Sequence, residues 1–286
     1  MQWCTRPALF SPPPDQAVRS MDKLADPGEP AIGPVQRCAS LLRLLAAAGT
    51  QGLALTYLSA RSGMAHPTVH RLLAQMIRER LVQQLEANRR YALGPLAFEL
   101  GVAAAQQFDI RGRCRPALEQ LAQDAGDTSY LIMRSRSEAV CLDMVEGPSA
   151  IRVVTLRVGS RRPLGIGAGG LAILAALPAT EREQLLPEIQ KEIEANWQFS
   201  RQALLRSITE TRKAGHALIR NRVTPGVSAI GLAFSDLTGR TVGAVSIAAV
   251  NDRLNARRIP ALTLMLTQAV KQIAAATRND SLLGNY

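Results

Sequence analysis

The chain has 286 residues, of which 47% are apolar and only 4% are aromatic. This length and composition fit two domains with aliphatic cores better than one small module. The formal net charge is +11, which favours a polyanionic partner or an anionic membrane surface. No apolar run approaches the roughly 18 residues of a transmembrane helix, and residues 1–20 lack the apolar segment of a secretion signal. We therefore expect a cytoplasmic protein with no membrane partner.

Positive charge is unevenly distributed along the chain. Residues 31–95 contain eight arginines and two acidic residues, whereas residues 112–286 contain 22 basic and 15 acidic residues. Only four of the 34 basic residues are lysines, so a general preference for arginine explains the residue type but not the local scarcity of acids. The distribution favours contact between the N-terminal segment and nucleic acid.

The four cysteines (Cys4, Cys38, Cys114 and Cys141) are widely spaced along the chain. They form no Cys-x-x-Cys pair and no Cys/His pattern with metal-ligand spacing. We expect free thiols in a reducing compartment, and neither a metal nor a cofactor.

The N-terminal third begins with residues 1–30, which are rich in proline and lack hydrophobic periodicity, so they predict a disordered tail. Helical periodicity starts at Val35, and Gly49 ends this first helix. Two more helices are predicted at 55–61 and 65–79, separated by a turn at Gly63.

The third predicted helix has two distinct faces. Its apolar positions follow helical spacing and should pack on the first two helices: Val69, Leu72, Leu73 and Met76. Pro67 fits only in the first turn, where its missing N–H has no intrahelical partner. A helix beginning near Ala65 therefore presents Thr68, His70 and Arg71 near its N-terminus, the end that a helix-turn-helix directs toward bases and phosphates.

Two short strands, 81–85 and 91–93, flank a polar turn at 86–90 and predict a β-hairpin. Arg89 and Arg90 at its tip suit a phosphate or minor-groove contact. The pattern predicts a winged helix-turn-helix, although a small helical bundle with a solvated basic face remains the alternative. The predicted DNA-binding residues are His66, Thr68, His70, Arg71, Gln75, Arg89 and Arg90.

A linker helix at 96–107 leads into a region of alternating helices and strands. Its predicted helices are at 116–124, 170–177, 180–197, 201–214 and 260–277. Its predicted strands are at 128–134, 139–145, 151–158, 228–235 and 241–249. We therefore expect an α+β chain with four parts: a tail (1–30), a winged helix-turn-helix (31–95), a linker helix (96–111), and an effector-binding and oligomerisation domain with a mostly antiparallel sheet (112–286).

Residues 165–170 satisfy the G-x-G-x-x-G pattern of a dinucleotide site and precede a helix. Pro163 before them is unfavourable in a buried parallel strand, and no regular βαβ alternation surrounds them. These features argue against a dinucleotide site, so a nucleotide-dependent enzyme with an accessory winged domain is only the alternative function. The sequence shows no Ser/His/Asp or metal pattern for such an enzyme, because His66, His70 and His216 are far apart. A C-terminal domain that only oligomerises is a third alternative.

The chain resembles the IclR family, named for the isocitrate lyase regulator, over about residues 34–275. The resemblance rests on Leu58 to Met64, Thr68 to Leu73 and Tyr91 to Pro95, and it continues through Leu118 to Ala122, Val158-Gly159, Pro163-Leu164 and Ala244 to Ser246. It implies a regulator without enzymatic activity that binds a double-stranded DNA operator, commonly of a catabolic operon, as a homodimer or homotetramer. One departure is His66-Pro67, where the family usually has Lys-Ser.

The resemblance also implies a GAF-like C-terminal domain that holds a small organic acid. The effector-binding positions it implies are Val154, Ala168, Gly169, Ala229, Ser246 and Ala248. Backbone N–H groups at a helix start after the glycines would favour a carboxylate. Ile219, Ala229 and Ala248 stand where relatives have more polar residues, so we expect a less polar pocket suited to an acid with an apolar or aromatic body.

Overall fold

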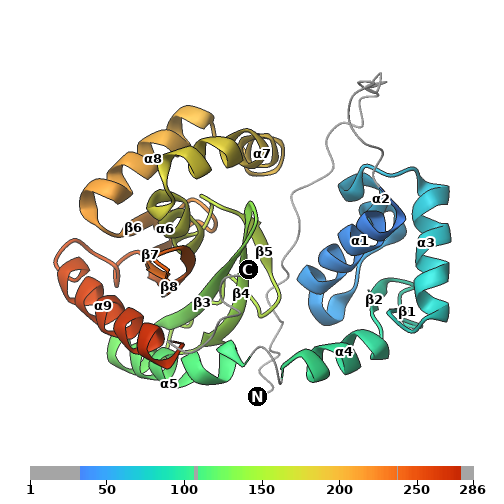
Figure 1. Cartoon of the computed structure of the whole chain (residues 1–286). Helices are drawn as coiled ribbons and strands as arrows, with labels where there is room; N and C mark the ends of the chain where they lie inside the picture. Colours follow the sequence, from blue (N-terminus) through green and yellow to red (C-terminus); the bar gives the residue numbers. More distant parts are fainter. Residues whose placement is uncertain (1–32, 106–108, 237, 278–286) are drawn as a thin grey trace, which may run out of the picture.

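The computed structural model describes residues 33–105, 109–236 and 238–277. An N-terminal helix-turn-helix domain is followed by helix α4 (Pro95–Ala105) and then by an α+β domain with an antiparallel sheet (Figure 1). This architecture confirms the predicted fold class. The predicted tail and the end of the predicted linker helix at 106–107 lie outside the described residues.

Three α-helices, one 3-10 helix and a hairpin make the N-terminal domain. They are α1 (Pro34–Ala48), the short 3-10 helix η1 (Gly49–Gln51), α2 (Leu55–Ser62), α3 (His66–Arg78), β1 (Val82–Gln84) and β2 (Tyr91–Leu93). Gly63 ends α2 with a φ of +67°, a left-handed conformation that glycine adopts without strain. This turn sets the angle at which α3 follows α2.

The core of this domain joins all of its elements. Leu41 and Leu45 of α1 and Leu58 of α2 pack against α3, β1 and β2. The edge of the hairpin also pairs with the segment before α2, because the N–H groups of Leu53 and Tyr91 each donate to the other residue's carbonyl oxygen at 2.8 Å. The hairpin is therefore fixed relative to α3.

The C-terminal domain is built on a six-stranded sheet in the order β5-β4-β3-β8-β7-β6, in which all neighbours are antiparallel. The strands are β3 (Thr128–Ser135), β4 (Glu138–Val145), β5 (Arg161–Pro163), β6 (Ala217–Arg220), β7 (Val227–Ser235) and β8 (Thr241–Val250). Pro163 lies in β5 at the edge of the sheet, where a residue without an N–H is tolerated.

Helices cover both faces of this sheet (Figure 1). One face carries α6 (Ala168–Ala176), α7 (Ala179–Trp197) and α8 (Arg201–Ala214), and the other carries α5 (Ile110–Ala125) and α9 (Ile259–Ala276). Successive residues of β3 therefore belong to different cores: Tyr130 and Ile132 face α6, whereas Leu131 and Met133 face α5 and α9.

One predicted strand is absent from the structure, and not every observed strand was predicted. The β-rich stretch predicted at 151–158 is not a strand but an irregular segment, and pairing with β4 occurs only beyond it, in β5 (Arg161–Pro163). Its backbone is held instead by the Tyr130 hydroxyl, which donates to the carbonyl of Val153 and accepts from the N–H of Thr155, both at 3.0 Å. Strand β6, which pairs with β7 at the other edge, was not predicted.

Helix α5 begins at Ile110, so Pro116 lies inside it rather than at its start. An internal proline removes one helical hydrogen bond. The added first turns bury Ile110 and Cys114 and place Arg111 and Arg115 beside Asp143. Packing and charge pairing thus outweigh the local signal.

Helix α9 is the one helix in the described residues that is long and apolar enough to cross a membrane by length and composition. This criterion averages hydropathy over the helix, which contains Gln268, Lys271 and Gln272 and is therefore not the uninterrupted apolar run that the sequence was predicted to lack. One side of α9, however, packs into the core with α5 through Leu262, Leu266, Ala269 and Ile273. Its apolar character serves the core of this domain.

Glycines allow α6 to lie very close to the sheet. A Cβ added to Gly169 would lie 2.7 Å from Cγ1 of Ile132, and one added to Gly231 of β7 would lie 2.9 Å from the carbonyl group of Ala168. Real Cβ contacts are not this short, so both positions require glycine. Gly169 in the glycine-rich run of 165–170 therefore allows close packing of α6 on the sheet.

Replacing Gly231 with alanine should therefore destabilise the C-terminal domain by about 1–3 kcal/mol, because the backbone of α6 must move away from β7. Urea unfolding of the full chain measures this loss. Gln202→Ala, an exposed change on α8, should stay within about 0.5 kcal/mol of the original protein. A Gly231→Ala variant as stable as the original would contradict the close approach.

Candidate DNA interface and ligand cavity

Helix α3 presents a polar face to solvent. The buried residues of α3 are Val69, Leu72, Leu73 and Met76, as its spacing predicted. Pro67 lies in the first turn of α3, which runs from His66 to Arg78. The observed start of α3 thus agrees with the start near Ala65 that Pro67 predicted.

The residues predicted to contact DNA gather on the outer face of α3 and on the hairpin. His66, His70, Arg71 and Gln75 are exposed, and Thr68 is half-buried near the helix start. Because the opposite face is packed into the core, rotation of the helix cannot hide these side chains. The arrangement suits insertion of α3 into a major groove with its N-terminal half toward the bases.

The tip of the hairpin adds two cations beside this face. Arg89 and Arg90 are exposed, and Arg89 has a φ of +57°, the left-handed region that is unfavourable for a residue with a side chain. The turn is held by the N–H of Arg89 donating to the Leu85 carbonyl at 2.9 Å and by the Asn88 side chain accepting from the N–H of Arg90 at 3.0 Å. Both arginines are therefore presented on a defined turn.

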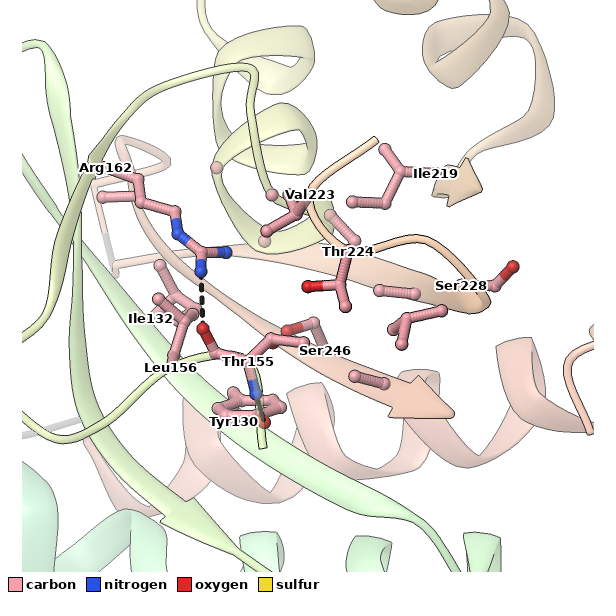
Figure 2. A pocket seen from close by; sticks show the side chains of 18 residues that line it. Tyr130, Ile132, Thr155, Leu156, Arg162, Ile219, Val223, Thr224, Ser228 and Ser246 are labelled. Atoms are coloured by element: carbon pink, nitrogen blue, oxygen red, sulfur yellow. Dashed lines mark hydrogen bonds between the residues drawn. The ribbon is translucent and has the colours of Figure 1, made fainter. Parts of the chain in front are cut away.

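A cavity lies in the C-terminal domain between the start of α6 and the α6-facing side of the sheet (Figure 2). The empty space measures about 580 Å³ when the open solvent at its mouth is included. Five of the residues predicted from the family resemblance line it: Ala168, Gly169, Ala229, Ser246 and Ala248. Val154 is not among the lining residues and is 44% exposed.

The polar lining of this cavity was largely not predicted. Tyr130, Thr155, Arg162 and Thr224 contribute polar groups among mainly apolar neighbours such as Ile132, Leu156, Ile219 and Val223. Burial raises the pKa of the Tyr130 phenol, so this hydroxyl stays protonated at neutral pH. The sequence feature that could have identified Arg162 as a cavity residue is its position directly before Pro163 and the glycine run, with no acidic residue next to it.

The surroundings of the glycine run differ from those of a dinucleotide site. The preceding strand, β5, is a three-residue antiparallel edge strand, whereas a dinucleotide fingerprint follows a parallel strand of a βαβ unit. The first turn of α6 nevertheless lines the cavity with Ala168, Gly169 and Gly170. This part of the run combines close packing with an exposed helix start.

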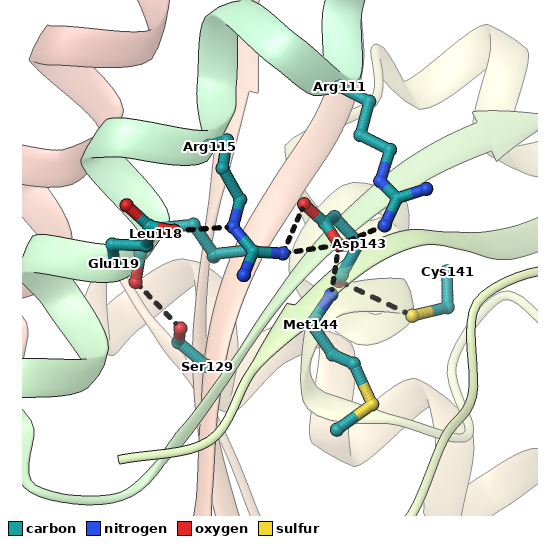
Figure 3. Close-up of polar contacts among 8 residues, drawn as sticks. All are labelled: Arg111, Arg115, Leu118, Glu119, Ser129, Cys141, Asp143 and Met144. Carbon is teal, nitrogen blue, oxygen red and sulfur yellow. Dashed lines mark hydrogen bonds and ion pairs between the residues drawn. The ribbon is translucent and has the colours of Figure 1, made fainter. Parts of the chain in front are cut away.

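Asp143 is buried within β4 (Figure 3). Its carboxylate accepts from Arg115 Nη1 at 3.2 Å, pairs with Arg111 Nη2 at 3.2 Å, and accepts from the N–H of Met144 at 2.9 Å. A carboxylate with these partners is compensated. Its role is to bind the first turns of α5 to the sheet.

The cysteines and histidines form no catalytic or metal cluster that the structure describes. Cys38, Cys114 and Cys141 take part in no disulfide, as predicted, and burial raises the pKa of the Cys141 thiol to about 12. Within residues 33–105, 109–236 and 238–277, no three His, Cys, Asp or Glu side chains gather in a way that could hold a metal ion. Cys4 lies outside the described residues.

A helix-turn-helix with a polar exposed face, a basic hairpin beside it and a mainly apolar cavity in a second domain together define a class of protein, the DNA-binding transcription regulators. Residues 34–86 match the family described as the IclR helix-turn-helix domain, and residues 102–275 match the one described as bacterial transcriptional regulator IclR C-terminal. The chain belongs to the IclR family and is a transcriptional regulator of this type.

Curated relatives agree with this assignment. The chain is 32% identical over 197 residues to an HTH-type transcriptional regulator of Mycobacterium tuberculosis, covering 69% of this chain and 74% of the relative. It is 28% identical over 223 residues to the HTH-type transcriptional regulator KipR of Bacillus subtilis, covering 78% and 88%. It is also 26% identical to the transcriptional repressor IclR of Escherichia coli, covering 86% and 92%.

Solved structures share the fold. An IclR-family regulator from Brucella abortus superposes with a TM-score of 0.68 at 23% identity, covering 92% of this chain and 96% of its own. An IclR homologue from Microbacterium hydrocarbonoxydans, complexed with 4-hydroxybenzoate, gives a TM-score of 0.62 at 18% identity, covering 86% and 99%. Both therefore contain the two-domain arrangement described above.

Replacing Arg71 with alanine should weaken specific DNA binding roughly tenfold to a hundredfold, the range expected when one base-contacting arginine is lost. Fluorescence anisotropy with a labelled operator measures this, and circular dichroism checks the fold. Arg212→Ala on α8 removes the same charge from an exposed position in the other domain and should change affinity little. Equal losses in both variants would remove Arg71 from the predicted readers.

Proposed function

We propose that this regulator is effector-responsive, and that a small organic acid in the cavity of the C-terminal domain changes its affinity for an operator of a catabolic operon. The observation that carries this proposal is the cavity itself, which is lined by the start of α6 and by mainly apolar side chains. A domain whose only role was assembly would not need such a space. The cytoplasm is the compartment where such a protein would act.

The lining supports an acid with an apolar or aromatic body. Ile219, Ala229 and Ala248 give the cavity an apolar wall, while Ser246 and Thr224 offer hydroxyl groups. The homologue complexed with 4-hydroxybenzoate is a relative in this fold whose ligand is an aromatic acid. We therefore expect aromatic monocarboxylates to be better effectors than glyoxylate-like acids.

The DNA contacts are assigned to the outer face of α3 and to the hairpin. His66, Thr68, His70, Arg71 and Gln75 would approach the major groove, and Arg89 and Arg90 would contact phosphates or the minor groove. His66-Pro67 stands where the family resemblance implies Lys-Ser, so a hydroxyl and a fixed positive charge are absent from the helix start. A target sequence particular to this protein would follow from that difference.

A second copy of this chain would cover helix α4. This helix is apolar around most of its circumference, yet none of its described residues is buried. Phe98, Leu100 and Val102 are 74%, 54% and 52% exposed, and an apolar helix of this kind is normally buried. Because α4 directly follows the DNA-binding domain, pairing through it would place two α3 helices on a palindromic operator.

Two contacts offer routes from the cavity to the DNA-binding domain besides α4. Gly159, in the segment held by Tyr130, lies so close to α1 that an added Cβ would be 3.3 Å from the Ala46 carbonyl oxygen. Arg61 of α2 donates to Glu192 of α7 at 2.9 Å and also to Asn196. An effector that moves this segment or α7 would thus alter contacts with the domain that binds DNA.

Footprinting of the upstream region of its own gene, with and without benzoate, 4-hydroxybenzoate and glyoxylate, tests the regulator function. We expect a protected palindrome whose protection changes with the aromatic acids and weakens steeply as salt rises, because phosphate contacts release counterions. Protection that ignores salt, or none at all, would defeat the proposal. Protection that no metabolite alters would favour a C-terminal domain that only oligomerises.

Replacing both Phe98 and Val102 with glutamate should dissociate the oligomer, because charges would be buried without partners at the interface. Light scattering during size exclusion chromatography reports the mass. The control is Glu99→Lys, a charge change on the same helix. Glu99 pairs with Arg80 in the original chain, and its replacement should leave the mass unchanged. An oligomer that survives the double change would exclude α4 as its interface.

A further inference from the structure

Arg162 of β5 extends its guanidinium into the cavity from the sheet edge (Figure 2). One of its amino groups donates to the Thr155 carbonyl oxygen, and the guanidinium lies 5.6 Å from the centre of the Trp197 ring. A guanidinium carries five N–H donors. Within the part of the chain that the structure describes, no acidic side chain lies within ion-pair distance of Arg162.

A second arginine in this domain shows what a satisfied guanidinium looks like. Arg222 donates to the Gly165 carbonyl at 3.1 Å and to Ser207 Oγ at 2.8 Å, and it lies 4.0 Å from the centre of the Phe199 ring. Burial lowers the pKa of Arg162 to about 10, so its positive charge persists at neutral pH at an energetic cost. Arg162 is thus the less compensated of the two.

The N-terminus of α6 meets Arg162 in the same cavity. Helix α6 has no side-chain cap, and its first intrahelical bond runs from the N–H of Leu171 to the Gly167 carbonyl. The N–H groups of the three preceding residues therefore point out of the helix start, where the helix dipole is positive. A Cβ placed on Gly167 would lie 3.9 Å from Nη1 of Arg162, so the cation and the helix start are neighbours.

Two positive features beside one cavity favour an anion between them. We infer that the effector's carboxylate binds between the Arg162 guanidinium and the first N–H groups of α6, which makes Arg162 the residue that selects acids over neutral ligands. This inference rests on the proposed function and assigns its ligand contact. One guanidinium in a largely apolar lining fits one carboxylate, with the body of the ligand against Ile132, Leu156 and Val223.

Calorimetry on the full-length protein with benzoate and with benzamide tests the assignment, since the two ligands share shape and differ in charge. We expect benzoate to bind at least tenfold more tightly than benzamide. Arg162→Gln should lose about tenfold to a hundredfold of benzoate affinity, the loss expected for a charge-assisted hydrogen bond, and should leave benzamide affinity unchanged. Arg161→Gln is the matched control, because Arg161 pairs with Glu138 at 2.9 Å and with Ser135 instead of lining the cavity.

Thermal unfolding without ligand separates a ligand-binding role from a structural one. Removing a buried charge that has no acidic partner should leave the melting temperature of Arg162→Gln equal to or above that of the original protein. Arg162→Met provides the same comparison if the glutamine variant does not fold. A lower melting temperature in both variants, together with unchanged benzoate affinity, would overturn the inference.

The outcomes also distinguish this inference from the proposed function. If benzoate binds the original protein and Arg162→Gln equally well, the effector-responsive function stands and the Arg162 assignment falls. If no benzoate binds while the salt-dependent footprint responds to a neutral metabolite, the carboxylate assignment again falls alone. An absent footprint would count against the regulator function, whatever calorimetry shows.

Discussion

The close approach of α6 to the sheet is the constraint on which the C-terminal domain depends. It requires Gly169 against Ile132 and Gly231 against the backbone of Ala168. Because no side chain separates the helix from the strands, the N-terminus of α6 lies directly over the polar groups of β3 and β8. The same contact that closes the core therefore also forms the wall of the cavity.

The cavity and the contacts between domains share structural parts. Tyr130 holds the irregular segment through Val153 and Thr155, and Arg162 donates to Thr155 from the other side. Trp197, whose ring lies near Arg162, is the last residue of α7, the helix that contacts Arg61 of the DNA-binding domain. A ligand charge at Arg162 would thus act on groups that are only a few residues from that interface.

The DNA-binding domain was the most predictable part of the chain. Its helices are short, their apolar spacing is regular, and Gly49, Gly63 and Pro67 mark their boundaries locally. The exposed face of α3 followed directly, because a helix whose Val69 and Leu73 are buried must turn His70 and Arg71 outward. Which of these side chains contacts a base remains a prediction, since it depends on the operator.

The C-terminal domain was predictable in outline and less so in detail. The segment 151–158 has the composition of a strand, yet Tyr130 satisfies part of its backbone, so it does not join the sheet there. Five of the six effector-binding positions that the family resemblance implies line the cavity, whereas Val154 is 44% exposed outside it. Arg162 and Tyr130 were not identified, because nothing in their local sequence reveals a shared cavity.

The sequence alone determined the winged helix-turn-helix, the α+β class and the basic character of the first domain, because these properties arise from local periodicity, turn residues and charge. Tertiary structure decided which groups meet across the sheet. The partners of Asp143, the glycine contacts of α6 and the position of Arg162 beside Gly167 join segments that are distant or differently folded. Such contacts depend on how the strands pair and on which face each helix covers, and no short stretch of sequence encodes either.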